Sequence, residues 1–291
     1  MRGTIDRMSH RLFARTGLAF AAAAVVAATV AAGVVATVGA ALVPQGAASA
    51  SDTPMEPPVA TVIPANDKEK KAILDGVAEA AQAKTTDALV KALTDMQTRK
   101  HEEFVPVIRA NVEAADPVVQ AAAIRAAGAH ELRDLEKSVR KTLRAKPKKS
   151  ASGELPGAVA VACIDYLDRL DIAGEEEAVV TDHLRVLFSD ERRLKASWAS
   201  DMLRAAIHYL GRRKFKPAVP FIIEEMIDRP VPKDPNDPKN PPATYWEART
   251  KLWQDYESWG RWMLKETTGQ TFRSVREWQA WLKTQDKKAY K

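Results

Sequence analysis

The strongest constraint on the fold of this chain is an apolar pattern with helical spacing that recurs through its central part. Four segments each carry apolar residues at positions i, i+4 and i+8, which places three side chains on one face of an α-helix. A second amphipathic segment precedes each of them, so the pattern predicts helix pairs that recur about every forty residues. The four triples are Phe104/Ile108/Val112, Leu135/Val139/Leu143, Val180/Leu184/Phe188 and Val219/Ile223/Ile227.

A helix pair of this kind has two apolar faces and cannot bury both by itself, so neighbouring pairs must stack on one another. We therefore expect an all-α fold, a short right-handed α-solenoid, over residues 67–227. A generic helical bundle would show the same apolar stripes and is the open alternative. A tetratricopeptide array would need a period of about 34 residues and an aromatic-Leu-Gly motif that the sequence does not contain.

The segment DPVVQAAAIRAAG, residues 116–128, adds detail to one pair. Asp116 is suited to the N-cap, Pro117 to the first helical position and Gly128 to a left-handed residue at the helix C-terminus. With the apolar helix that follows, it resembles a HEAT repeat closely over residues 116–143 and more loosely over 85–112 and 155–227. The strings FVPVI and VPFII look like the starts of HEAT second helices. The resemblance implies an armadillo-type α-solenoid.

The C-terminal part is rich in tryptophan. All seven tryptophans lie beyond residue 197, and six lie at or after residue 246. We expect a helix over residues 244–265 followed by a stop at Gly269, and then a short helix that opens with a capping box of Ser274 and Glu277. The string LKETTGQTFRSVREWQAWLK resembles the terminal segment of exported bacterial HEAT-like proteins.

Residues 244–291 are therefore either a Trp-rich cap or a binding patch. Aromatic residues at helical spacing are usually core, and a terminal repeat has to cover the open end of a solenoid. Exposed, the same side chains would bind sugar rings or a protein, because they combine a large rigid area with a polar handle. The candidate partner-binding residues are Trp246, Trp253, Trp259, Trp262, Trp278 and Trp281.

Two segments interrupt the helical pattern. Residues 144–157 are basic and then small, which is typical of a solvated loop, with a contact to an anionic partner as the alternative. Residues 228–243 contain six prolines and cannot continue a helix. Asp234, Asp237 and Asn240 recur there at every third residue, but calcium needs about 6–8 oxygen ligands at a different spacing. We expect a stiff loop without a metal.

Residues 1–50 have the features of an export signal. Arginines precede an uncharged apolar stretch over residues 18–43, and Ala48-Ser49-Ala50 forms a cleavage site of the small-x-small type. The stretch also reaches the ~20 residues that span a bilayer, so an uncleaved anchor is the alternative. A proline-rich linker, residues 51–66, follows. Either outcome places the domain outside the cytoplasm, in the periplasm, envelope or exterior, with membrane contact only through an uncleaved segment.

The composition gives little support for catalysis or nucleic-acid binding. The leader contributes +3 of the net charge of +6 (four arginines against one aspartate), so the rest is nearly balanced. The single cysteine, Cys163, excludes an internal disulfide and lies on an apolar helix face, where we expect it to be buried. No HExxH, GxSxG, P-loop or GxGxxG motif is present, so we expect no catalytic residue, cofactor or metal.

The leading hypothesis is a non-enzymatic protein-binding scaffold, because stacked repeats offer an extended surface to a protein partner. The partner is not identified by the sequence; a basic ridge is one candidate surface, although an ordinary solvated helix face accounts for it better. A glycan-binding envelope module that uses the C-terminal aromatics is the alternative, and a lyase-type enzyme on a HEAT-like fold has the least support. The ridge comprises Gln120, Arg125, Arg133, Lys137 and Arg140.

Overall fold

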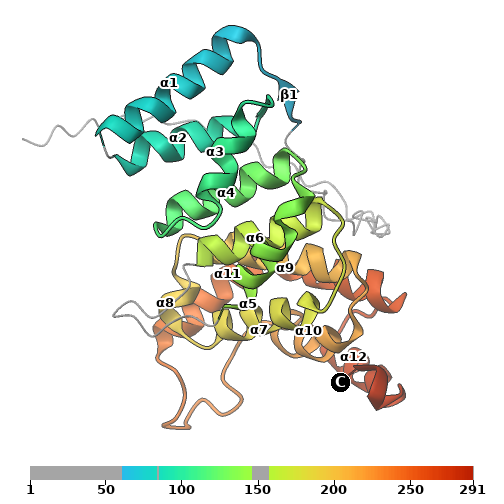
Figure 1. The fold of residues 1–291 in the computed structure, drawn as a ribbon. Helices are drawn as coiled ribbons and strands as arrows, with labels where there is room; N and C mark the ends of the chain where they lie inside the picture. Colours follow the sequence, from blue (N-terminus) through green and yellow to red (C-terminus); the bar gives the residue numbers. More distant parts are fainter. Residues whose placement is uncertain (1–60, 84, 146–156, 291) are drawn as a thin grey trace, which may run out of the picture. The chain divides into compact units, whose positions relative to one another are not determined.

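The computed structural model describes residues 61–83, 85–145 and 157–290, all within one compact unit of the chain. The predicted leader, most of the predicted linker and the middle of the basic segment 144–157 lie outside these ranges. The described part is mostly α-helical, as the sequence predicts (Figure 1).

Twelve α-helices lie within the described residues, with three short 3-10 turns and two two-residue strands that pair in parallel. Strands this short carry no alternating pattern, which is why the sequence did not predict them. The helices are α1 (Asp67–Ala83), α2 (Thr86–Met96), α3 (Phe104–Asn111), α4 (Pro117–Ala129), α5 (Glu136–Arg144), α6 (Gly157–Arg169), α7 (Glu176–Phe188), α8 (Glu191–Leu194), α9 (Ala199–Arg212), α10 (Val219–Met226), α11 (Ala243–Thr268) and α12 (Val275–Lys283). The remaining elements are β1 (Ile63–Pro64), β2 (Arg99–Lys100), η1 (Arg133–Leu135), η2 (Lys216–Ala218) and η3 (Lys287–Tyr290).

Helices α2, α4, α6, α9 and α11 pack against one another in chain order. Helix α4 contacts both α2 and α6, and α9 contacts both α6 and α11 (Figure 1). The intervening helices α3, α5, α7 and α10 pack against this row, and α5 also contacts α7. Most of the predicted apolar triples are buried between these helices; Leu135 and Phe188 are half-buried against the same core.

The same left-handed turn follows α4, α6 and α9. Glu131, Asp171 and Lys214 have φ angles of 58°, 52° and 51°. In each case the next residue donates its backbone N–H to a carbonyl five residues earlier, at 2.9–3.1 Å. This is the 6→1 hydrogen bond of a Schellman C-cap. The turn recurs about every forty residues, in register with the helix pairs.

The ends of α4 confirm one prediction and correct another. The carboxylate of Asp116 accepts hydrogen bonds from the N–H groups of Val118 (2.8 Å) and Val119 (3.2 Å), as an N-cap should. Gly128 is not the left-handed residue that the sequence predicts, because α4 continues past it and the turn falls at Glu131. A Cβ at Gly128 would lie 3.5 Å from the Cα of Tyr166, so its small size serves the contact with α6.

Residues 228–242 form a loop, as their prolines predict. The carboxylates of Asp234 and Asp237 accept hydrogen bonds from the N–H groups of Asn236 and Lys239, both at 2.9 Å. The spacing of three between these acidic residues therefore reflects consecutive turns, each closed by its own side chain. Across the described ranges, no cluster of three or more His, Cys, Asp or Glu residues is placed to hold a metal.

Candidate functional site

The six candidate tryptophans are packed into the structure rather than displayed on it. Trp278 is 1% exposed, and the other five are half-buried; all of these five except Trp253 pack against the hydrophobic core. They form three groups, which pack around Arg249, around His208 and around Phe272. The exposed large apolar side chains in the described part are Ile63, Val118, Val186 and Val231.

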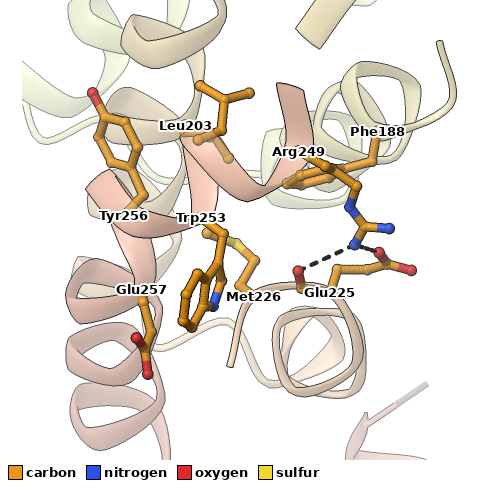
Figure 2. Close-up of a pocket in the computed structure, with 9 residues that line it drawn as sticks. Phe188, Leu203, Glu225, Met226, Arg249, Trp253, Tyr256 and Glu257 are labelled. Atoms are coloured by element: carbon orange, nitrogen blue, oxygen red, sulfur yellow. Dashed lines mark hydrogen bonds and ion pairs between the residues drawn. The ribbon is translucent and has the colours of Figure 1, made fainter. Parts of the chain in front are cut away.

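The first group surrounds Arg249, whose side chain lies between α11 and α10 (Figure 2). Its guanidinium forms an ion pair with Glu225, donates a hydrogen bond to the Glu225 carbonyl oxygen at 3.2 Å and lies 5.0 Å from the centre of the Phe188 ring. Trp246 packs at 5.8 Å from the same guanidinium, and Trp253 lines the adjoining hollow. That hollow holds about 10 Å³, space for a single water molecule and too small for an organic ligand.

The second group joins α6, α9 and α11. The rings of His208 and Trp262 stack with centroids 5.5 Å apart and an interplanar angle of 10°, and Trp259 packs edge-on against both. The Nδ1 atom of His208 lies 2.5 Å from a carboxylate oxygen of Asp168. A Cβ on Gly211 would lie 2.6 Å from the Trp262 ring, so only glycine admits the indole in this position.

An aspartate–histidine pair can orient a general base, but catalysis also needs a nucleophile or a substrate proton within reach. The thiol of Cys163 is fully buried, and burial raises its pKa, so it is held as an inert thiol. Because the His208 ring stacks on Trp262, a structural role in packing explains the Asp168–His208 pair better than a catalytic role does. Its residues are forty positions apart in the sequence and meet only because α6 packs against α9, so no local sequence signal marks the pair.

The third group covers the end of the chain. Trp278 and Phe272 meet edge to face at 4.9 Å, and Trp281 packs edge-on against both Trp278 and Tyr290. The predicted capping box is confirmed: the N–H of Glu277 donates to Ser274 Oγ, and the N–H of Ser274 donates to Glu277 Oε2. Gly269 ends α11 with a φ of 72°, also as predicted.

A surface of a different kind lies on η1 and α5. Five cationic side chains line an open hollow there, and we call them the α5 basic face. They include three members of the ridge predicted from the sequence; the other two, Gln120 and Arg125, lie on α4 and do not join it. The α5 basic face comprises Arg133, Lys137, Arg140, Lys141 and Arg144.

A buried carboxylate fixes two of these arginines. The side chain of Glu176, in the first turn of α7, is 0% exposed and forms ion pairs with both Arg140 and Arg144. Arg140 also donates to Glu136 Oε1 at 2.7 Å and to the Ala173 carbonyl oxygen at 2.8 Å. No sequence motif marks Glu176, because its burial depends on the approach of α5 to α7, which is a tertiary feature.

Two further histidines, His130 (buried) and His183 (half-buried), contact backbone carbonyl groups. The Nε2 atom of His130 lies 3.0 Å and 3.1 Å from the carbonyl oxygens of Met96 and Arg99, and that of His183 lies 3.1 Å from the carbonyl oxygen of Leu143. Burial lowers the pKa of both imidazoles below its usual value. Each imidazole is therefore kept neutral and ties one helix pair to the next.

Comparison of the chain with protein-family models, with curated proteins and with solved structures found no match. Among the helices in the described ranges, none has the length and apolar character required to cross a bilayer.

Proposed function

We propose that this chain is a non-enzymatic protein-binding scaffold of the cell envelope or exterior, built from HEAT-like helix pairs. The observation that carries the proposal is the left-handed turn repeated at Glu131, Asp171 and Lys214, in register with helices that pack in chain order. Repeats joined in this way make an extended surface, and such surfaces bind peptides and protein faces. The aromatic groups on α11 and α12 act as the cap of the array.

The alternative of glycan binding through the C-terminal tryptophans has less support. A sugar ring stacks on an aromatic face that is open to solvent, and none of the six candidate side chains is exposed. Two hollows lie near them, one of about 360 Å³ between α10, α12 and η3 and one of about 470 Å³ between α9 and α11, and no tryptophan is among the described residues that line either. The α5 basic face is the better candidate for contact with a partner.

The test is site-specific photo-crosslinking in the native host with the full-length chain. A photoreactive residue replaces Lys141 on the α5 basic face in one variant and Lys265, exposed on α11, in the control. We expect a discrete protein adduct at position 141 that is absent at position 265. Absence of any protein adduct, or the same adducts at both positions, would contradict the scaffold. Fractionation of the same cells checks that the chain lies outside the cytoplasm.

A further inference from the structure

We propose that the α5 basic face binds an extended acidic segment of the partner protein, with glutamate or aspartate at alternate positions. This inference names the partner chemistry for the scaffold proposed above and rests on that function. It is carried by the unpaired cations of the face, by their spacing, and by the two arginines that Glu176 holds in place.

Three cationic side chains of the face form no ion pair with a carboxylate of the described residues. Lys137 and Lys141 are exposed, and within the described residues no carboxylate lies within ion-pair distance of either. Arg133 donates a hydrogen bond to the carbonyl oxygen of Leu170 at 2.6 Å, but its charge likewise has no carboxylate at that distance in the described ranges. An anionic partner would therefore meet these charges without displacing an existing ion pair.

The spacing of the lysines favours an extended peptide. Lys137 and Lys141 are four residues apart on α5, so their Cβ atoms lie about 5–6 Å apart on one side of the helix. Alternate side chains of an extended strand point the same way and repeat at about 6.6 Å. Two acidic side chains separated by one residue can therefore meet both lysines at once.

Arg144 extends this row at low entropic cost. Its guanidinium is held by Glu176 and yet stays 46% exposed, while Arg140 beside it is held by Glu136 and Glu176. A side chain that is already ordered loses little conformational freedom when a ligand binds. A third acidic residue of the same peptide would therefore find a cation in a fixed place.

The surroundings of the face disfavour nucleic acid. Exposed carboxylates interrupt it: Glu175, 94% exposed, lies 3.8 Å from Arg144, and Asp134, 50% exposed, forms an ion pair with Arg109 at the other end. A continuous phosphate backbone would be repelled by both, whereas a peptide can place uncharged residues opposite them. Aromatic side chains, on which single-stranded bases stack, are absent from the described residues that line the hollow.

The experiment measures binding of the full-length chain to a fluorescent twelve-residue peptide of alternating glutamate and serine. The variant Lys137→Glu/Lys141→Glu removes the row. The matched control, Lys283→Glu/Lys287→Glu, makes the same change of charge at two exposed lysines four residues apart at the C-terminal end. Circular dichroism verifies that both variants fold. We expect the first variant to weaken binding by about tenfold or more and the control by about twofold or less.

Equal loss in the two variants would overturn the proposal, because the binding would then follow net charge alone. Tighter binding of a DNA duplex, or of vesicles containing phosphatidylglycerol, than of the peptide would overturn the choice of an acidic segment. The scaffold is tested separately by the crosslink at position 141. A protein adduct without peptide binding would support the protein-binding scaffold and contradict the acidic segment as its ligand. Peptide binding without any adduct would contradict the scaffold, although the α5 basic face would still bind acidic peptides.

Discussion

The hydroxyl of Tyr166 on α6 donates a hydrogen bond of 2.6 Å to the carbonyl oxygen of Leu132, the residue that follows the left-handed turn after α4. In the same way, the hydroxyl of Tyr209 on α9 lies 3.4 Å from the carbonyl oxygen of Ile172, which follows the left-handed turn after α6. The two tyrosines therefore join the first two of the three left-handed turns to the helices α6 and α9.

We expect Tyr166→Phe to lower the free energy of unfolding by about 1 kcal/mol, because it removes one neutral hydrogen bond and leaves the packing of the ring. Tyr209→Phe should cost less, because its hydrogen bond is longer. The midpoint of urea unfolding measures both. A larger loss for Tyr209→Phe would show that the geometry of these bonds does not set their contribution.

Gly211 and Gly269 give a matched pair of alanine substitutions. Gly211→Ala should displace Trp262 and lower the free energy of unfolding by about 1–3 kcal/mol, with a change in near-ultraviolet circular dichroism. Gly269→Ala places its methyl in open space and costs about 1–2 kcal/mol through its left-handed φ alone. Its near-ultraviolet spectrum should match the wild type. If Gly211→Ala leaves the spectrum unchanged, Trp262 does not depend on this glycine.

Two adjacent glutamates at the start of α7 allow the contribution of a buried ion pair to stability to be compared with that of an exposed one. Glu176→Gln removes the charge that Arg140 and Arg144 share and should lower the free energy of unfolding by about 3 kcal/mol, the lower end for a broken buried pair, since Arg140 keeps Glu136. Glu175→Gln, at a 94% exposed side chain, should change it by less than about 0.5 kcal/mol. Denaturant unfolding of the two variants at one pH compares them. Similar values for both would contradict the burial of Glu176.

Stability should fall as the pH drops from 7.5 to 5.5. Burial lowers the folded-state pKa of His130 and His183, so below about pH 6.5 the unfolded chain binds protons that the folded chain does not. The contribution of the two neutral imidazoles to the free energy of unfolding is complete above about pH 6.5 and is lost as the pH falls toward their lowered folded-state pKa values. Burial raises the pKa of Asp165, which acts with the opposite sign at lower pH.

The substitutions His130→Gln and His183→Gln should each flatten this profile, because glutamine keeps a hydrogen-bond donor and does not titrate. Thermal unfolding at several pH values provides the profile. A slope that survives the double substitution would assign the effect to other groups.

Local chemistry accounts for what the sequence predicted well. The N-cap at Asp116, the capping box of Ser274 and Glu277, and the left-handed Gly269 each depend on residues a few positions apart. The apolar triples were equally reliable, because helical spacing is itself a local property.

Contacts between helix pairs account for what the sequence missed. The left-handed turns contain charged residues in place of glycine, so the sequence does not mark Glu131 as a left-handed position. The helix C-terminus was therefore predicted at the nearby Gly128. The burial of Glu176 and the contact of Asp168 with His208 depend on which helices meet. The degree to which each tryptophan is buried is likewise a tertiary result: helical spacing favours a cap, but it does not exclude a binding patch.

The hydrogen bonds between pairs run in both directions along the chain. Tyr166 reaches back from α6 to Leu132, while Arg133 and Arg140 reach forward to the carbonyl oxygens of Leu170 and Ala173. A cut between two pairs would thus leave orphaned polar groups on both fragments. A helix pair could therefore not be deleted or duplicated without loss of stability, because each new junction would need matching donors and acceptors. For the same reason, several helix pairs should unfold together rather than one at a time.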